Sequence, residues 1–505
     1  MSPTPVILGI DLGTTEVKAG LVTFDGRLVA LARGGYDLDV RGGPGWAEQD
    51  PGAWWSAVVG AVRGLRVAED VGAVDVVAIG VDGHGPTLAP VDARGEATRP
   101  AITFLDTRAR AEAAELTAAT GVRGWALGPL PAALWLERHE PEAAAATRWY
   151  LTTWEWLAYR LTGEALAPRV PVELEPDLGD VARATGLHIE RRPADGVVGA
   201  LVGTLTEASA AALGLRAGIP VSGGTNDAFA SYLGAGLLEP GDAFDPGGSA
   251  GGFGVYWHEP VEVPGAFVTP APLAGLYSVG AAMAATGRAL DWYRDSIVGG
   301  GTPGAVTTER LLEEAAATAP GADGLVFLPY LAGERSPLWD PTATGVLAGL
   351  TLGHGRGHLA RSIIEASALA IRHVSTPMLA AGVRVTAMRA CGGPARSDVW
   401  NQVKADVTGF RVLVPRVLET AVLGSAILGA VGIGVASDLT AAIRAMTGIE
   451  REIEPRPEFA ATYERLFEAY VALYPAVSAV TRQLAGPVPT AGPGQAAVAG
   501  RDVVS

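Results

Sequence analysis

The sequence predicts an α/β fold on three observations. Continuous apolar runs of strand length, such as Val6 to Ile10 and Val74 to Val81, end at polar turns that contain glycine. Alanine-rich segments with helical patterns, such as Ala53 to Leu65 and Thr107 to Thr120, lie between and after these runs. A similar order of strand and glycine turn begins again after about residue 238. Strands that alternate with helices are typical of α/β proteins, and 505 residues, 49% of them hydrophobic, suffice for two large domains.

The first half opens with a predicted hairpin. The strand Val6 to Ile10 leads into the turn Asp11-Leu12-Gly13-Thr14-Thr15, and Val17 to Phe24 predicts a second strand. Asp25-Gly26 is a hairpin signal, and Leu28 to Leu31 predicts a third strand after it.

Later turns also follow apolar runs. The buried strand Val74 to Val81 ends at Asp82-Gly83-His84-Gly85, and the short run Ile219 to Val221 ends at a turn that contains Asp227. In the second half, the run Val383 to Met388 ends at a turn with two glycines. Polar residues at such strand ends are candidates for function in α/β proteins.

The second half repeats the pattern of the first. Asp245-Pro246-Gly247-Gly248-Ser249 precedes an apolar segment, as Asp11 to Thr15 does. We interpret this as a sign of two related halves, with chance similarity of glycine turns as the alternative. Glu239-Pro240-Gly241 is a plausible boundary, which predicts domains at 1–238 and 239–485. The Gly-, Ala- and Pro-rich segment 486–505 predicts a disordered tail.

Composition excludes several classes of partner. The net charge is −16, and no strong basic patch stands out, so we expect no nucleic-acid partner. The single cysteine, Cys391, excludes an intrachain disulfide and favours a reducing, cytoplasmic setting. Met1 to Pro5 shows no signal-peptide pattern. The uncharged stretch Ala421 to Ala436 is too short to cross a bilayer and predicts a buried helix, so we expect no membrane partner.

The first turn carries groups suited to a polyphosphate. A tight turn after a buried strand exposes backbone N–H groups, and Thr14, Thr15 and Lys18 add donors. Asp11 is a candidate support for Mg2+ through water, because Mg2+ keeps much of its hydration shell. A polar hairpin that begins with an Asx-turn is the other interpretation.

Asp227 is the candidate catalytic carboxylate. It lies in Ser222-Gly223-Gly224-Thr225-Asn226-Asp227, where a strand gives way to the helical segment Ala228 to Gly236. A carboxylate there can accept the proton of a substrate hydroxyl during phosphoryl transfer. A helix N-cap explains the residue equally well from local sequence.

The segment Ala390-Cys391-Gly392-Gly393-Pro394-Ala395-Arg396-Ser397 is a candidate nucleotide turn. Two glycines permit close approach of a flat ligand, and a helix N-terminus after them favours phosphate. A plain corner between a strand and a helix is the alternative. The chain lacks the Gly-x-x-x-x-Gly-Lys-Ser/Thr motif, so an ordinary P-loop kinase is excluded.

A longer pattern resembles a known family. Gly345-Val346-Leu347-Ala348-Gly349-Leu350, then seven residues, then His358-Leu359-Ala360-Arg361-Ser362-Ile363-Ile364-Glu365, is similar to the C-terminal signature of the FGGY carbohydrate kinases. Phe327 to Pro337 looks like another hallmark of that family. The resemblance covers about residues 5 to 480. Further matching points, in order, are Asp11, Gly83-His84, Phe104 to Arg108, Trp135-Leu136, Asp227, Gly248-Ser249, Gly287 and Gly392-Gly393.

The resemblance implies a two-domain actin-like ATPase fold in which each domain has a ribonuclease-H-like core. It also implies that ATP and sugar bind between the domains, that Asp227 is the catalytic base and that Asp11 supports the metal. The implied sugar contacts are Gly83, His84, Asp106 and Asn226. The implied phosphate and nucleotide contacts are Gly13, Thr14, Thr15, Lys18, Gly248, Ser249, Gly287, Asp291, Gly392, Gly393 and Ser397.

The chain departs from the family pattern in several places, and the departures in its N-terminal half bear on the substrate. Gly248 stands where the second phosphate turn usually has threonine, and the segment Pro131-Ala132-Ala133-Leu134-Trp135 has alanine where a lysine usually precedes the tryptophan. Asp82-Gly83-His84-Gly85 keeps the histidine of the Gln-Met-His-Gly turn of xylulokinase-like enzymes but loses the two side chains before it. The acidic stretch Pro171 to Asp180 does not match the usual Ser/Thr-containing segment. Asp245 adds a negative charge beside the second turn.

Together these features predict an ATP- and Mg2+-dependent sugar kinase that transfers phosphate directly, without a phosphoenzyme. A ketopentose such as xylulose is the leading substrate because His84 is kept. Another ketose, a polyol or an aldonate is the alternative within this class. A non-catalytic sugar- or nucleotide-binding protein on the same fold is the alternative of another class. A homodimer is common in families of this kind and is a possible assembly.

Overall fold

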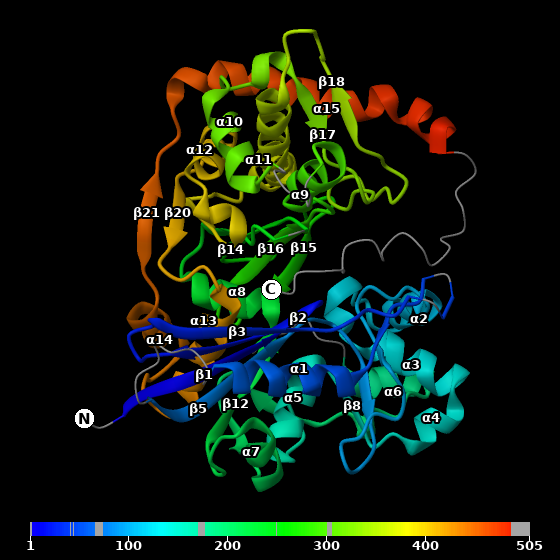
Figure 1. Ribbon diagram of the computed structural model, residues 1–505. Helices are drawn as coiled ribbons and strands as arrows, with labels where there is room; N and C mark the ends of the chain where they lie inside the picture. The colour runs from blue at the N-terminus through cyan, green and yellow to red at the C-terminus, as the bar shows by residue number, and fades with distance from the viewer. Residues whose placement is uncertain are drawn as a thin grey trace.

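The computed structural model describes residues 3–40, 42–43, 45–65, 74–169, 177–248, 250–299 and 306–485. Two lobes lie one above the other in Figure 1, each built around a twisted sheet. The predicted α/β class is therefore confirmed. The predicted tail, 486–505, lies outside the described residues.

The first sheet has six strands in the spatial order β11-β12-β5-β1-β2-β3. Strand β1 pairs in parallel with β5 and antiparallel with β2, and β5 pairs in parallel with β12. The strands are β1 Thr4–Leu12, β2 Glu16–Val22, β3 Leu28–Gly35, β5 Val74–Gly83, β11 Leu201–Thr204 and β12 Pro220–Asn226.

The second sheet has seven strands in the order β15-β16-β14-β13-β19-β20-β21. The strands are β13 Asp242–Asp245, β14 Gly252–Trp257, β15 Phe267–Pro270, β16 Tyr277–Ala282, β19 Ala387–Ala390, β20 Val412–Pro415 and β21 Ile449–Ile453. Its core, β20-β19-β13-β14-β16, has the same order and pairing senses as β12-β5-β1-β2-β3. The two glycine turns occupy corresponding hairpins, so the sequence similarity between the halves reflects repeated topology rather than chance.

Four short pairs of strands complete the β structure. They are β4 Glu48–Gln49 with β7 Ala101–Ile102, β6 Ala89–Val91 with β8 Trp149–Leu151, β9 Leu166–Arg169 with β10 Ala194–Val197, and β17 Val326–Leu328 with β18 Val346–Ala348.

Helices cover both faces of the sheets. In the lower lobe of Figure 1 they are α1 Pro51–Gly64, α2 Arg110–Thr120, α3 Leu130–His139, α4 Pro141–Ala146, α5 Thr153–Thr162, α6 Leu178–Thr185 and α7 Glu207–Leu213. The others are α8 Asp227–Ala235, α9 Arg288–Trp292, α10 Thr308–Ala317, α11 Arg356–Ala380, α12 Asp398–Thr408, α13 Thr420–Gly432, α14 Leu439–Met446 and α15 Ala460–Ala485.

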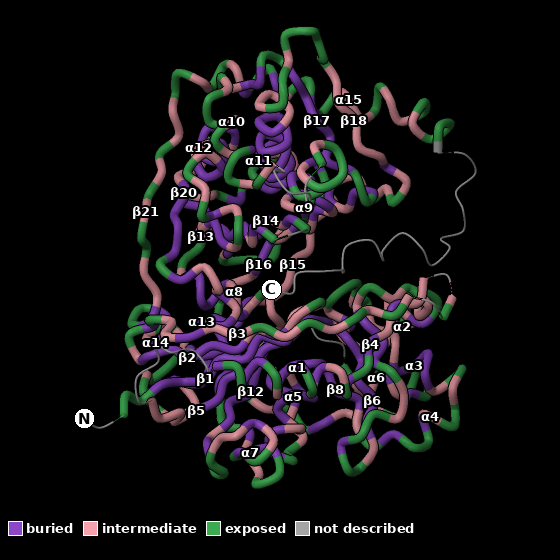
Figure 2. The backbone as a smooth tube through the Cα atoms, in the orientation of Figure 1, coloured by how far each residue is buried: buried purple, intermediate pink, exposed green. Residues whose placement is uncertain are grey.

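Alternate residues of β1 face different helices. Val6, Leu8 and Ile10 pack in one core cluster with α1 and α5, whereas Ile7 packs in another with α8 and α13. This is the period of two expected of a strand buried on both faces. In Figure 2 the buried residues form continuous purple segments of the tube at the centre of each lobe.

Helix α13 comes from the second half of the chain but packs against the first sheet and α8. Glycines permit this approach: a Cβ at Gly80 would lie 1.7 Å from the carbonyl oxygen of Ser425, and one at Gly424 would lie 1.9 Å from that of Ala230. The buried helix predicted at 421–436 is confirmed as α13, except that it ends at Gly432 rather than at 436, and α8 and α13 together join the lobes (Figure 1).

Two predicted element limits are wrong. The helix expected from Thr107 begins at Arg110, because the N–H of Thr107 donates to the Gly45 carbonyl and that of Arg108 donates to the Asp106 carboxylate. The strand expected from Val383 begins at Ala387, because the N–H of Val383 still closes the end of α11.

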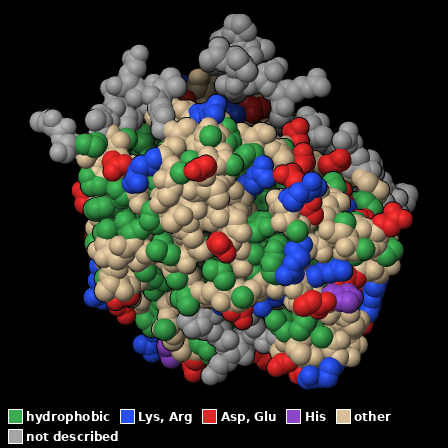
Figure 3. Space-filling model, turned by 90° about the horizontal axis from the view of Figure 1, so that it is seen from below, with side chains coloured by type: hydrophobic (Ala, Val, Ile, Leu, Met, Phe, Trp, Pro, Cys, Tyr) green, Lys and Arg blue, Asp and Glu red, His purple; other side chains and the backbone are tan. Residues whose placement is uncertain are grey.

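Among the described helices, none combines the length and the apolar composition that a membrane crossing requires. On the face seen in Figure 3, Lys and Arg side chains are interspersed with Asp and Glu.

Candidate active site

The site forms where three neighbouring strands of the first sheet end. Asp11 of β1 lies opposite Asp82 of β5, and Thr225 of β12 also pairs with Asp82. Because these strands are parallel, their carboxyl ends meet at one edge of the sheet, the usual place for a site in open α/β sheets.

A cleft of about 2540 Å3 opens at this edge and is lined by both lobes. Its volume exceeds the roughly 300–1,000 Å3 of a typical small-ligand pocket, so it has room for two ligands. The predicted site residues that line it are Asp11, Gly13, Thr14, Thr15, Lys18, Asn226, Asp227, Gly248 and Gly392. The structure thus brings both glycine turns, the lysine and the proposed base to one space.

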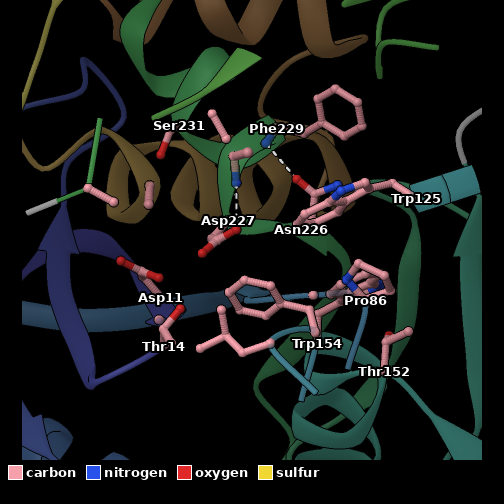
Figure 4. Close-up of a pocket in the computed structure, with 18 of the residues that line it drawn as sticks. Asp11, Thr14, Pro86, Trp125, Thr152, Trp154, Asn226, Asp227, Phe229 and Ser231 are labelled. Atoms are coloured by element: carbon pink, nitrogen blue, oxygen red, sulfur yellow. Dashed lines mark hydrogen bonds between the residues drawn. The ribbon is translucent and has the colours of Figure 1, made fainter. Parts of the chain in front are cut away.

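Asp227 is the first residue of α8, and Asn226 is its N-cap. The Asn226 carboxamide oxygen accepts the N–H of Phe229 at 2.8 Å, and the Asp227 carboxylate accepts the N–H of Ala228 at 2.8 Å (Figure 4). Asn226 therefore fills the capping role that the sequence left open for Asp227. Burial, reinforced by the charge of Asp11, raises the pKa of Asp227 to about 7.

Asp11 and Asp82 make this edge of the sheet strongly acidic. Asp82 is fully buried and accepts a hydrogen bond from the Ser425 hydroxyl of α13. Burial and then the Asp11 charge raise the pKa of Asp82 well above its ordinary value. Burial raises the pKa of Asp11 as well, against the opposing charge of Lys18. Asp11 Oδ1 is buried without a hydrogen-bond partner in the described structure.

Lys18 lies across from Asp11 on the β1–β2 hairpin. Its ammonium group is 3.9 Å from Asp11 Oδ2, 3.8 Å from Glu16 Oε1 and 3.4 Å from Glu419 Oε2. Glu419 precedes α13 and also pairs with Arg33 at 2.6 Å, so it connects the hairpin to the second half of the chain.

A buried ion pair holds the second glycine turn, residues 246–248, in place. The Asp245 carboxylate accepts the N–H of Gly247 at 3.0 Å and pairs with Lys404 of α12. Gly247 has φ of 57° and lies so close to the Cys391 carbonyl that a Cβ would be 2.0 Å from its oxygen. The turns at 246–248 and 391–392 therefore pack directly on each other. Ser249 lies outside the described residues.

Three predicted sugar contacts lie behind the wall of the cleft rather than on it. His84 is fully buried; its ring meets Trp54 and Phe104, and Nδ1 lies 3.1 Å from the Thr87 hydroxyl. Burial lowers the pKa of His84 to about 3, so the ring is neutral. Gly83 packs under Thr153, where a Cβ would be 2.4 Å from Oγ1.

Asp106, the third of these residues, has a structural partner. Its carboxylate accepts the N–H of Ala47 and pairs with Arg108, whose guanidinium lies over the Trp46 ring at 3.6 Å from the centroid. The side chain is 1% exposed.

The remaining nucleotide predictions also lie off the cleft. Gly287 precedes α9, and Asp291 on α9 pairs with Arg294 at 3.1 Å. Gly393 begins a short 3-10 turn after Gly392, and the Ser397 hydroxyl caps α12 by accepting the N–H of Trp400.

Sequence reasoning missed the aromatic side of the cleft. Trp154 and Trp125 line it, and Figure 4 shows both, with Pro86, on the side of Asp227 away from Asp11. Neither was singled out among the twelve tryptophans. Trp154 follows β8 and lies within α5, and no strand was predicted there, so no local pattern pointed to it.

Among the described residues, no group of three His, Cys, Asp or Glu side chains is arranged to hold a metal ion.

Comparison with known proteins defines the class. The FGGY family of carbohydrate kinases matches this chain with its N-terminal domain over residues 6–192 and its C-terminal domain over residues 248–433. Xylulose kinase of Escherichia coli is 31% identical over 426 residues, which covers 80% of this chain and 84% of that protein. Glycerol kinase of Chloroflexus aggregans is 28% identical over 499 residues, with 91% and 96% covered. The crystal structure of xylulose kinase from Rhodospirillum rubrum superposes with a TM-score of 0.78 at 31% identity, covering 94% and 100%.

The fold, the cleft and these relatives define a sugar-phosphorylating enzyme. The chain belongs to the FGGY family of carbohydrate kinases and has the two-domain, actin-like ATPase fold of that family. The resemblance found in the sequence is therefore confirmed.

Proposed function

We propose that this carbohydrate kinase transfers the terminal phosphate of ATP to a hydroxyl of xylulose or a closely related ketopentose, with Asp227 as general base. One observation carries the proposal: Asp227 lines the same cleft as both glycine turns and Lys18, and burial raises the pKa of its carboxylate to about 7. A base of that pKa is half deprotonated at neutral pH and can accept the hydroxyl proton. The sugar follows the names of the relatives in Escherichia coli and Rhodospirillum rubrum.

In a direct transfer of phosphate from ATP to the sugar, the residues of the cleft have different roles. Asp227 takes the proton as the sugar oxygen attacks phosphorus in line, so no phosphoenzyme forms. The amides of the first turn, the hydroxyls of Thr14 and Thr15, and the ammonium of Lys18 balance the negative charge of the phosphates. Gly248 lets the backbone of the second turn approach the phosphates without a side chain.

The site fits Mg2+ held mainly by phosphate oxygens and water. Asp11 Oδ1 is a buried oxygen that lacks a partner, and such an oxygen suits a hydrated divalent cation. Asp82 is fully buried and accepts the Ser425 hydroxyl, whereas Asp11 lines the cleft, so Asp11 is the carboxylate placed to support the ion. When bound, Mg2+ would neutralise charge on the phosphates.

The sugar side is an aromatic wall with amide groups nearby. Trp154, Trp125 and Phe104 present ring surface, and Asn226 lies next to the base. His84 helps to hold the backbone of this wall, because the carbonyl oxygen of His84 accepts a hydrogen bond from the hydroxyl of Thr153, the residue before Trp154, at 2.5 Å. The case for xylulose therefore rests on the relatives and not on a contact from the His84 ring.

The proposal includes the setting and organisation of the enzyme. The single buried thiol of Cys391 suits a reducing cytoplasm. The two sheets lie on opposite sides of residue 238 in the sequence, which supports a sugar-side domain at 1–238 and a nucleotide-side domain at 239–485. A homodimer remains a proposal that gel filtration with light scattering would test.

The test is release of ADP, coupled to oxidation of NADH, across ketoses, aldoses, polyols and aldonates. We expect xylulose to raise the rate far above the ATP-only background, with other ketopentoses next. The same panel with Asp227→Asn gives the background of the protein without its base.

A polyol or aldonate that exceeds every ketose would contradict the assignment of the sugar but keep the kinase. A flat panel accompanied by sugar-induced shifts of Tm would indicate binding without turnover and contradict the proposed reaction.

A further inference from the structure

Three successive carbonyl groups of the first glycine turn are held by hydrogen bonds. The Tyr36 hydroxyl donates to the Gly13 oxygen, and the Gln49 carboxamide donates to the Thr14 oxygen at 2.7 Å. The Tyr36 backbone N–H donates to the Thr15 oxygen at 3.2 Å. Each peptide unit from Gly13 to Glu16 therefore has its orientation set by a residue outside the turn.

The two residues that hold the turn are themselves fixed. Gln49 is 2% exposed, and its Oε1 accepts the indole N–H of Trp54, which is fully buried on α1. Burial, together with the nearby Asp11 charge, raises the pKa of Tyr36, so its phenol stays a hydrogen-bond donor at neutral pH.

Because each peptide unit is planar, fixing its carbonyl group also fixes the direction of the N–H group in the same unit. In a trans peptide the N–H points opposite to the preceding C=O. The N–H groups of Thr14 and Thr15 therefore point away from Tyr36 and Gln49. In the described part of the chain neither N–H donates a hydrogen bond, and both residues line the cleft. Two adjacent free N–H groups of this kind form a concave site for an anion.

We infer that Tyr36 and Gln49 are positioning residues that hold the Thr14 and Thr15 amides in place for a phosphate group of the bound nucleotide. The inference rests on the proposed function, because it takes the ligand to be ATP. Both act through the turn: they fix its carbonyls before the ligand arrives, so binding does not have to order the loop.

The test compares Tyr36→Phe, which removes only the hydroxyl, with Gln49→Met, which removes the amide donor at similar volume. Tyr159→Phe is a matched control, because the Tyr159 hydroxyl also donates to a backbone carbonyl, that of Ala93, away from the turn. Calorimetric titration of the full chain with the Mg2+ complex of AMP-PNP and with adenosine separates phosphate binding from adenosine binding. Thermal unfolding reports any general loss of stability.

We expect Tyr36→Phe and Gln49→Met each to weaken AMP-PNP roughly tenfold, the effect of about one hydrogen bond. Adenosine affinity and Tm should stay within the range of Tyr159→Phe, and KM for the sugar should not change. Unchanged AMP-PNP affinity in both variants would overturn the inference. Equal losses for AMP-PNP and adenosine with a lower Tm would also overturn it, in favour of a merely structural role. Absence of AMP-PNP binding to the unmodified protein would instead overturn the proposed function and this inference with it.

Discussion

Asp245 and Lys404 form an ion pair although their side chains are only 4% and 2% exposed. Asp245 is the last residue of β13 and Asp11 is the last but one of β1, the strand that takes the same place in the first sheet, so the two carboxylates lie at corresponding strand ends of the repeated halves. Asp11 lines the cleft, and its Oδ1 has no hydrogen-bond partner in the described structure. Asp245 instead pairs with Lys404 and accepts the N–H of Gly247. We therefore propose that the same position supports a ligand in one half, whereas in the other half it holds a turn.

Replacing one partner of the Asp245–Lys404 pair should destabilise the protein more than replacing both. We expect Lys404→Met to lower the free energy of unfolding by about 3–5 kcal/mol, because it leaves a buried carboxylate without its counter-charge. Asp245→Asn with Lys404→Met should recover most of that loss, since the amide oxygen still accepts the Gly247 N–H. Denaturant unfolding of the three proteins measures both effects. A double variant less stable than Lys404→Met would show that the pair does not act in this way.

Asp227→Asn should abolish most of the turnover while ATP still binds. Loss of a general base costs roughly 10²–10⁴-fold in rate, and Asn226 continues to cap α8. Single-turnover rates and ATP titration of the same variant test both parts. A variant that keeps near-normal rates would mean that another group takes the proton.

The raised pKa of Asp227 predicts the pH dependence of sugar phosphorylation. The base works when deprotonated, so kcat/KM for the sugar should rise about tenfold per pH unit up to pH 7 and level off above it. In Asp227→Asn the small residual rate should lack this acid limb. A wild-type profile that is flat from pH 5.5 to 8 would contradict the pKa and the role.

Gly80→Ala should disturb the packing of α13 on the first sheet. The new Cβ would lie 1.7 Å from the Ser425 carbonyl oxygen, so backbone must shift, at a cost of roughly 1–3 kcal/mol or more. Gly60→Ala on α1 is the matched control, because nothing lies within 4 Å of its Cβ. Alanine there should stabilise the helix by about 0.5–1 kcal/mol. Thermal unfolding compares the pair, and similar shifts in both would contradict the close packing.

A row of aromatic rings crosses the cleft between the lobes. Trp125 lies 5.7 Å from Phe104 in its own lobe and 5.8 Å from Phe267 of β15 in the other, centroid to centroid. Such ring contacts are worth about 0.5–1.5 kcal/mol. We expect Trp125→Ala to raise KM for the sugar and the sugar-independent release of ADP, because the closed cleft excludes water less well. Trp125→Phe, which keeps a ring, should do so less, and equal effects of both substitutions would count against this role.

Much of the site could be predicted because its signals are local. Strand β1, the turn after it and Lys18 lie within one hairpin, so their neighbourhood follows from the alternation of apolar residues and a glycine turn. Asp227 was predicted for the same reason, at a strand end before a helix. His84 was also placed at a predicted strand end, and Asp106 followed from the family resemblance, but whether a side chain faces the cleft or the core depends on packing that no local pattern shows.

The sequence by itself determined the α/β class and the chemistry of the turns, because these depend on residue types a few positions apart, whereas the repetition of the two halves was decided by the sheet topology. The tertiary structure alone decided which distant groups meet: Asp245 with Lys404, Lys18 with Glu419, Trp125 with Phe267, and α13 with the first sheet. It also decided that Tyr36 and Gln49 hold the first turn. Such contacts depend on how sheets and helices pack, and packing is set by the sum of many weak apolar contacts over the whole chain.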